Sequence, residues 1–143
     1  MEDSYLLLLG SQGCGKRSIV REINTKYVRN TNKSMPVEKM GSDYAALDCS
    51  FLFVKDLLDS EMANEDNMSK LNIWSVSDSE RCELIEGVLS PKDLERTAAV
   101  ICLDFENPME IMSNLRTWLS ALSKSLFNIV PNMEVGAHEK MKQ

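Results

Sequence analysis

The feature that most constrains the fold is a short glycine-rich segment that directly follows an apolar run. The apolar run Tyr5–Leu9 is typical of a buried strand, and the segment after it reads Gly10-Ser-Gln-Gly-Cys-Gly-Lys16. Apolar side chains then recur at helical spacing, at Ile19, Val20, Ile23 and Tyr27. The sequence therefore predicts a strand, a glycine loop and a helix that begins near Lys16.

The segment matches the pattern GxxxxGK, which in this context indicates a phosphate-binding P-loop. Glycines let consecutive backbone amides face one concavity, the helix N-terminus adds partial positive charge, and the lysine reaches the outer phosphates. The candidate phosphate-binding residues are Gly10, Ser11, Gln12, Gly13, Cys14, Gly15, Lys16, Arg17 and Ser18. The alternative is a structural strand-to-helix turn that binds no nucleotide, and both interpretations stay open.

The residue after the lysine departs from the working motif. A P-loop that binds Mg²⁺ carries Ser or Thr there, because its hydroxyl coordinates the metal. Arg17 replaces that ligand with a like charge, and Ser18 lies about 100° further round the helix. We therefore expect no metal site. GDP, GTP or ATP would bind without turnover, and no cofactor is required.

Other catalytic elements are also missing. The third predicted strand continues as Ser75-Val-Ser-Asp-Ser-Glu80, where a GTPase has DxxG and a water-orienting glutamine. Ser77 and Asp78 are interpreted instead as caps of the next helix. No NKxD motif follows for guanine recognition. The sequence predicts no catalytic residue and no enzyme, and a P-loop phosphotransferase is the least favoured class.

The rest of the chain alternates strands and helices. Strands are predicted near residues 5–9, 50–55, 71–76 and 98–103. Ser90-Pro91 and Asn107-Pro108 both indicate helix caps. The long helix after Pro108 has an apolar stripe that we expect to face the core: Ile111, Met112, Leu115, Trp118, Leu119, Leu122 and Leu126. This order predicts an α/β layered domain with a mostly parallel sheet.

Length and composition exclude several classes. A chain of 143 residues suits one domain, and its net charge of −6 argues against a general nucleic-acid binder. No apolar run approaches the roughly 20 residues that span a bilayer. Four cysteines without CxxC spacing and a single histidine indicate small core residues in a reduced, intracellular protein: Cys14, Cys49, Cys82 and Cys102.

Taken together, residues 5–130 resemble the Ras-like domain of the cytoplasmic dynein light intermediate chains. Three segments carry the resemblance: the apolar run with its glycine loop, the strand Leu71-Asn-Ile-Trp-Ser-Val76, and Ala99-Val-Ile-Cys-Leu-Asp104. The third segment is followed by Pro108, Leu115 and Trp118 on an amphipathic helix. Two departures are Arg17, where the family usually has Thr, and Ser77-Asp78, where it often has Asp-Gly.

The resemblance implies a non-catalytic accessory subunit of the cytoplasmic dynein microtubule motor. Its GTPase-like domain would dock on the tail of the dynein heavy chain beside other dynein subunits, in the cytoplasm on microtubules. The alternative is a divergent small GTPase that acts as a nucleotide-dependent switch. The resemblance gives no reason to assign nucleic acid or membrane as a partner.

Length also bears on completeness. A Ras-like sheet has six strands, and the sequence predicts four. We therefore expect residues 1–130 to form a Ras-like P-loop domain that is truncated after the fourth strand and its helix, followed by a polar tail over residues 131–143. Such a domain would leave a sheet edge or helix face uncovered, which favours a partner.

Overall fold

A computed structural model describes residues 3–31, 45–55 and 68–132 of the chain. The strands and main helices follow one another in the predicted order: β1 (Ser4–Leu9), α1 (Lys16–Thr31), β2 (Leu47–Lys55), β3 (Met68–Val76), α2 (Cys82–Val88), β4 (Thr97–Ile101) and α3 (Ile111–Ile129). Three short 3₁₀ helices are added: η1 (Pro91–Arg96), η2 (Pro108–Glu110) and η3 (Val130–Asn132). Residues 32–44 and 56–67, together with the predicted tail beyond residue 132, lie outside the described residues.

The four strands form one mixed sheet in the order β2-β3-β1-β4. The strand β1 lies at the centre and runs parallel to both β3 and β4, so that Leu7 lies between Trp74 and Ala99. The strand β2 runs antiparallel to β3, with Asp48 opposite Ser75. The predicted α/β class is confirmed, and the predicted parallel pairing holds for β3, β1 and β4.

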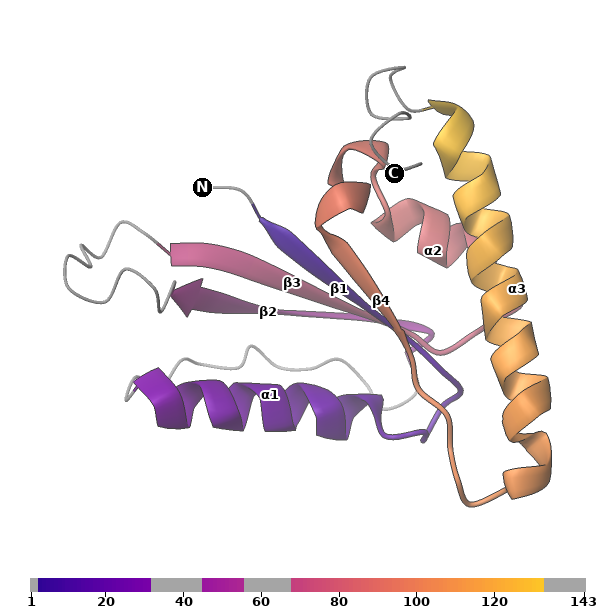
Figure 1. Cartoon of the computed structure of the whole chain (residues 1–143), viewed down its shortest axis with the longest axis horizontal. Coiled ribbons are helices and arrows are strands. Elements are labelled where there is room, and N and C mark those ends of the chain that lie inside the picture. The colour runs from indigo at the N-terminus through magenta and orange to yellow at the C-terminus, as the bar shows by residue number, and fades with distance from the viewer. Residues whose placement is uncertain (1–2, 32–44, 56–67, 133–143) are drawn as a thin grey trace.

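Helices cover both faces of the sheet. Figure 1 shows α1 on one face and α2 with α3 on the other. The alternation of side chains along β1 serves both layers. Leu8 packs with Val20 of α1 on the first face, whereas Leu7 and Leu9 pack with Ile85 of α2 and Trp118 of α3 on the second. The continuous run of leucines is explained by this two-sided burial.

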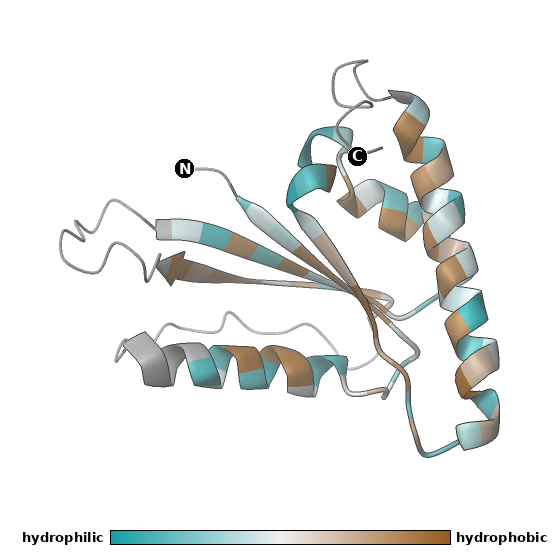
Figure 2. Cartoon of the chain, in the orientation of Figure 1, coloured by the Kyte–Doolittle hydropathy of each residue, from teal (hydrophilic) through white to brown (hydrophobic). Residues whose placement is uncertain are grey.

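Within the described residues, β4 is paired on one side only. Its register places Ala98 beside Leu6 and Val100 beside Leu8, so these side chains share the face that α1 covers over β1. Both are nevertheless exposed, and Val100 keeps 40% of its surface. Figure 2 shows β4 coloured as hydrophobic over most of its length. This edge has no neighbour among the described residues, whereas the expected truncation after the fourth strand and its helix stays a prediction.

The burial of α3 corrects the predicted apolar stripe. Trp118, Ala121, Ser125 and Ile129 form the buried side of the helix, whereas Met112 and Leu119 are 58% and 49% exposed. Leu122 and Leu126 of the predicted stripe are partly buried and pack against the core, as expected. Ser125, which is not part of the stripe, is buried on the same helix. Its hydroxyl donates to the carbonyl oxygens of Ala121 at 3.0 Å and Cys82 at 3.2 Å. The hydroxyl is therefore satisfied inside the core.

The predicted side-chain caps are wrong, although the prolines are placed correctly. Ser90 and Asn107 precede 3₁₀ helices that begin with proline, and neither side chain makes a cap hydrogen bond. The helix α2 has Arg81 as its N-cap, so neither Ser77 nor Asp78 caps it. The carboxylate of Asp78 instead accepts a hydrogen bond from the Glu80 amide at 3.0 Å. It therefore stabilises the turn before the helix.

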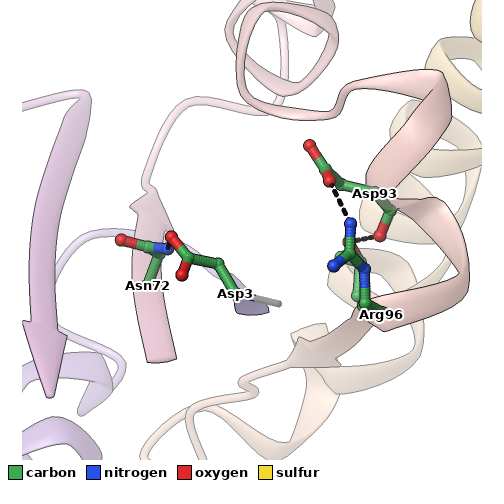
Figure 3. A network of polar contacts seen from close by, with 5 residues as sticks. Asp3, Asn72, Asp93 and Arg96 are labelled. Atoms are coloured by element: carbon green, nitrogen blue, oxygen red, sulfur yellow. Dashed lines mark hydrogen bonds and ion pairs between the residues drawn. The ribbon is translucent and has the colours of Figure 1, made fainter. Parts of the chain in front are cut away.

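Polar contacts connect the elements near the start of β1 (Figure 3). The side-chain amide of Asn72 donates to Asp3 at 3.2 Å, which joins β3 to the residue before β1. In η1, the guanidinium of Arg96 contacts the Asp93 carboxylate at 2.9 Å, and the hydroxyl of Thr97 donates to the Asp93 carbonyl. These contacts lie at the end of β1 opposite to the glycine loop.

Candidate functional site

The glycine loop (residues 10–15) connects β1 to α1, and each glycine has a local cause. Gly13 and Gly15 have φ angles of 82° and 94°, a region that L side chains rarely adopt. Gly10 is required for space: an added Cβ would lie 2.5 Å from Cys14 Sγ and 2.6 Å from the carbonyl oxygen of Cys102. The predicted strand, loop and helix are therefore present. Phosphate binding by the loop stays a prediction.

The side chain of Lys16 closes the loop from inside. Lys16 is only 6% exposed. Its Nζ donates to the carbonyl oxygens of Gly10 at 2.5 Å and Ser11 at 2.8 Å, and to Cys14 Sγ at 3.6 Å. A buried ammonium group needs such partners, because burial without hydrogen bonds is costly. In this conformation, the lysine stabilises the loop that precedes it.

A cavity of about 440 Å³ lies over the loop, and we call it the loop cavity. That volume is within the range of small-molecule sites. Six of the nine predicted phosphate-binding residues line it: Gln12, Gly13, Gly15, Lys16, Arg17 and Ser18. The remaining three, Gly10, Ser11 and Cys14, are not part of its lining.

Four further lining residues were not predicted as site residues: Ala45, Asp48, Ser75 and Ser77. The antiparallel register of β2 and β3 places Asp48 opposite Ser75, and the Ser77 amide donates to Ala46 at 2.9 Å. The sequence gives no short-range indication that β2 pairs with β3. Ser75 and Ser77 could have been predicted as site residues from their place at the carboxyl end of β3, because ligands of open α/β sheets bind at the carboxyl ends of parallel strands.

The charges of the loop cavity favour an anion. Lys16 and Arg17 contribute two positive charges and Asp48 one negative charge, on a chain whose net charge is −6. The first turn of α1 contains no acidic residue, so no carboxylate of that turn neutralises the partial positive charge at the helix N-terminus. The site therefore suits a phosphate-bearing ligand on electrostatic grounds.

The same residues fit Mg²⁺ poorly. Arg17 lines the loop cavity at the position where a hydroxyl would coordinate the metal. Ser18 also lines it, in spite of its different angle on the helix. Across the described ranges, no group of three or more His, Cys, Asp or Glu side chains is arranged to hold a metal ion. The donor set therefore favours direct contact of Arg17 with a phosphate oxygen over metal-bridged binding.

The fold and the loop together define an α/β domain with the strand order 2-3-1-4 and a glycine loop after its central strand. The crystal structure of the conserved domain of the dynein light intermediate chain has a similar fold, with a TM-score of 0.63 and 19% sequence identity. The match covers 99% of this chain and 40% of that one. No protein-family model and no curated protein matches the sequence. The likeness establishes the fold.

No helix among the described residues combines the length and the apolar character needed to cross a bilayer.

Proposed function

We propose that this chain is a non-catalytic accessory component of a cytoplasmic dynein motor, which docks on the tail of the dynein heavy chain. The observation that carries the proposal is the fold shared with the dynein light intermediate chain domain over 99% of this chain. Because that domain's chain is considerably longer, the proposal concerns docking alone. The implied location is the cytoplasm, on microtubules.

The glycine loop supports a structural role over a catalytic one. The ammonium group of Lys16 donates to the carbonyl oxygens of Gly10 and Ser11, and Arg17 lies at the position where a magnesium ligand would be needed. Docking requires a folded surface and no hydrolysis. The Lys16 contacts and the Arg17 side chain therefore disfavour a nucleotide cycle but leave the proposed docking role intact.

Exposed apolar side chains support the need for a protein partner. Phe105, which follows β4, is 77% exposed, and Met109, which precedes α3, is 94% exposed. Val100 on β4 and Phe127 on α3 are also exposed, at 40% and 79%. Aromatic residues and methionine are enriched where proteins meet, whereas large exposed apolar groups are unfavourable in water.

The proposal is tested by co-purification of the full chain with a dynein heavy-chain tail. We expect the double variant Phe105→Ser, Met109→Glu to retain less heavy chain than the wild type by tenfold or more, with an unchanged melting temperature. Phe53→Ser is the matched control, since Phe53 is an exposed aromatic residue on β2, at the other edge of the sheet. Equal retention by both variants would contradict a contact through Phe105 and Met109.

A nucleotide-dependent switch is the second candidate function, and the loop cavity is the observation that favours it. Its volume and positive charge suit a phosphate-bearing ligand. A switch requires that GTP and GDP have different effects on the protein. Equal melting temperatures with GTP and with GDP, each in the presence of Mg²⁺, would exclude this function. A difference between them would support it.

A further inference from the structure

Two cysteines that are far apart in the sequence meet beside the glycine loop. Cys14 belongs to the loop, and Cys102 directly follows β4. A Cβ built on Gly10 would lie 2.5 Å from Cys14 Sγ and 3.1 Å from Cys102 Cβ, so both side chains border the same point. The backbone holds them there, because the Cys102 amide donates to the Leu9 carbonyl at 2.7 Å. Both cysteines are free, with no disulfide at either one.

The surroundings activate one of the two sulfurs. The thiol of Cys102 donates a hydrogen bond to Cys14, and this bond, together with the nearby Lys16 ammonium, lowers the pKa of Cys14 to about 6. The Nζ atom of Lys16 lies 3.6 Å from Cys14 Sγ. The same hydrogen bond and burial raise the pKa of Cys102. The Lys16 contact and the Cys102 neighbour therefore favour a thiolate at Cys14 beside a thiol at Cys102, and the thiolate is the reactive form of cysteine.

The other cysteines lack this arrangement. Cys49 is an exposed residue on β2, and partial loss of solvent around its sulfur together with the Asp48 carboxylate raises the pKa of its thiol. Cys82 is half-buried at the start of α2. Cys49 is therefore more exposed but less ionised than Cys14, which makes it a useful internal control for reactivity.

We propose that Cys14 and Cys102 form a redox-sensitive pair that a hydroperoxide converts to a disulfide. The Cys14 thiolate attacks one peroxide oxygen, the O–O bond breaks, and the departing oxygen takes up a proton and leaves as water or an alcohol. The resulting sulfenic acid is attacked by Cys102 sulfur. The S–O bond breaks, the S–S bond forms, and the departing hydroxide takes up the thiol proton and leaves as water. The two cysteines lose two electrons, and the peroxide gains them.

The disulfide would act on the loop directly. It would join Cys14 to the residue that follows β4 and so restrict the glycine loop to fewer conformations. It would also remove the thiolate next to Lys16, whose ammonium group would keep its contacts with the carbonyl oxygens of Gly10 and Ser11. This inference is independent of the proposed dynein role, since it rests on the side chains around Gly10 alone.

The test uses the full wild-type chain treated with hydrogen peroxide and then analysed by mass spectrometry under non-reducing conditions. We expect the loss of two hydrogens and a tryptic species that joins residues 1–16 to residues 97–116. Dithiothreitol should reverse both changes, and Cys49→Ser should leave them in place. In Cys102→Ser, Cys14 should remain a sulfenic acid that dimedone traps. Oxidation of Cys49 ahead of Cys14, or no linked species, would overturn the proposal.

A second measurement tests the activation of Cys14 without oxidation. The rate of its alkylation by iodoacetamide should rise with a midpoint near pH 6 in the wild type. In Lys16→Met and in Cys102→Ala, which remove the ammonium group and the thiol donor respectively, the midpoint should move towards the ordinary thiol value of about 8.5. A wild-type midpoint at the ordinary value would contradict the proposed pair.

Discussion

The ammonium group of Lys16, the first residue of α1, donates a hydrogen bond of 2.8 Å to the carbonyl oxygen of Ser11, five residues earlier in the glycine loop. The lysine that the sequence pattern assigns to phosphate binding is therefore a structural part of its own loop. A phosphate ligand would have to compete with this contact and with the one to Gly10. This relationship leads to predictions on stability and on ligand binding.

Replacing Lys16 by Met should destabilise the fold. The substitution keeps most of the side-chain length but leaves the buried carbonyl oxygen of Gly10 and the partly buried one of Ser11 without their charged donor. Hydrogen bonds to charged groups contribute about 1.5–3 kcal/mol, so we expect a loss of about 2 kcal/mol in the free energy of unfolding. Urea denaturation measures it. Lys26→Met is the control, because Lys26 forms only an exposed ion pair with Glu22 and should cost less than about 1 kcal/mol. Equal losses would refute the structural role.

Replacing Arg17 by Thr should restore metal-dependent nucleotide binding. The substitution removes a positive charge from the loop cavity and supplies the hydroxyl that Mg²⁺ needs. A ligand at 100 times its Kd stabilises a protein by about 2.7 kcal/mol, which a melting curve resolves. We expect a shift with GTP that requires Mg²⁺ in this variant and none in the wild type. Arg21→Thr, at an exposed site one turn further along α1, is the control. A magnesium-dependent shift in the wild type would show that Arg17 does not disable the site.

Alanine substitutions at Gly10 and at Gly87 should change the stability of the fold in opposite directions. A Cβ at Gly10 would lie 2.6 Å from the carbonyl oxygen of Cys102. This oxygen is a backbone atom, so it cannot move away as easily as a flexible side chain. Overpacking of this kind costs about 1–3 kcal/mol. Nothing lies within 4 Å of a Cβ at Gly87 in α2, and alanine is the better helix former by about 0.5–1 kcal/mol. Thermal unfolding should therefore show a lower melting temperature for Gly10→Ala and a higher one for Gly87→Ala. Two changes of the same sign would contradict the packing around Gly10.

Two neighbouring residues test the orientation of α3. Trp118 is 2% exposed against the core, whereas Leu119 is 49% exposed. Trp118→Ala should cost about 3–5 kcal/mol, because a large buried side chain leaves a cavity. Leu119→Ala should cost less than about 1 kcal/mol. Denaturant titration gives both values. A larger loss of stability for Leu119→Ala than for Trp118→Ala would contradict the orientation of α3 described above.

The local order of elements could be predicted from the sequence. Apolar runs predicted β1 and β4, and helical spacing with Pro108 predicted the region of α3, because these patterns depend on neighbours in the chain. The loop was predicted for the same reason. The antiparallel pairing of β2 with β3 depends on contacts between separate segments, so Asp48 and Ser75 were missed in the loop cavity.

The errors on α3 and on the caps have a common cause. An apolar stripe gives the possible buried side of a helix, but the packing partner decides how wide that side is. Met112 and Leu119 belong to the stripe and remain exposed, while Ser125 is buried against Cys82. Ser90 and Asn107 match the composition of caps, but the 3₁₀ turns after them use the backbone carbonyl oxygens of these residues.

The central claim is docking on the dynein heavy chain without a nucleotide cycle. It is tested most directly by titrating a heavy-chain tail with the full wild-type chain, with and without GTP and Mg²⁺. We predict saturable binding with one affinity that is the same, within a factor of two, under both conditions. No binding by a folded chain would contradict the dynein role. Binding that appears only with GTP and Mg²⁺ would instead establish a nucleotide-dependent switch.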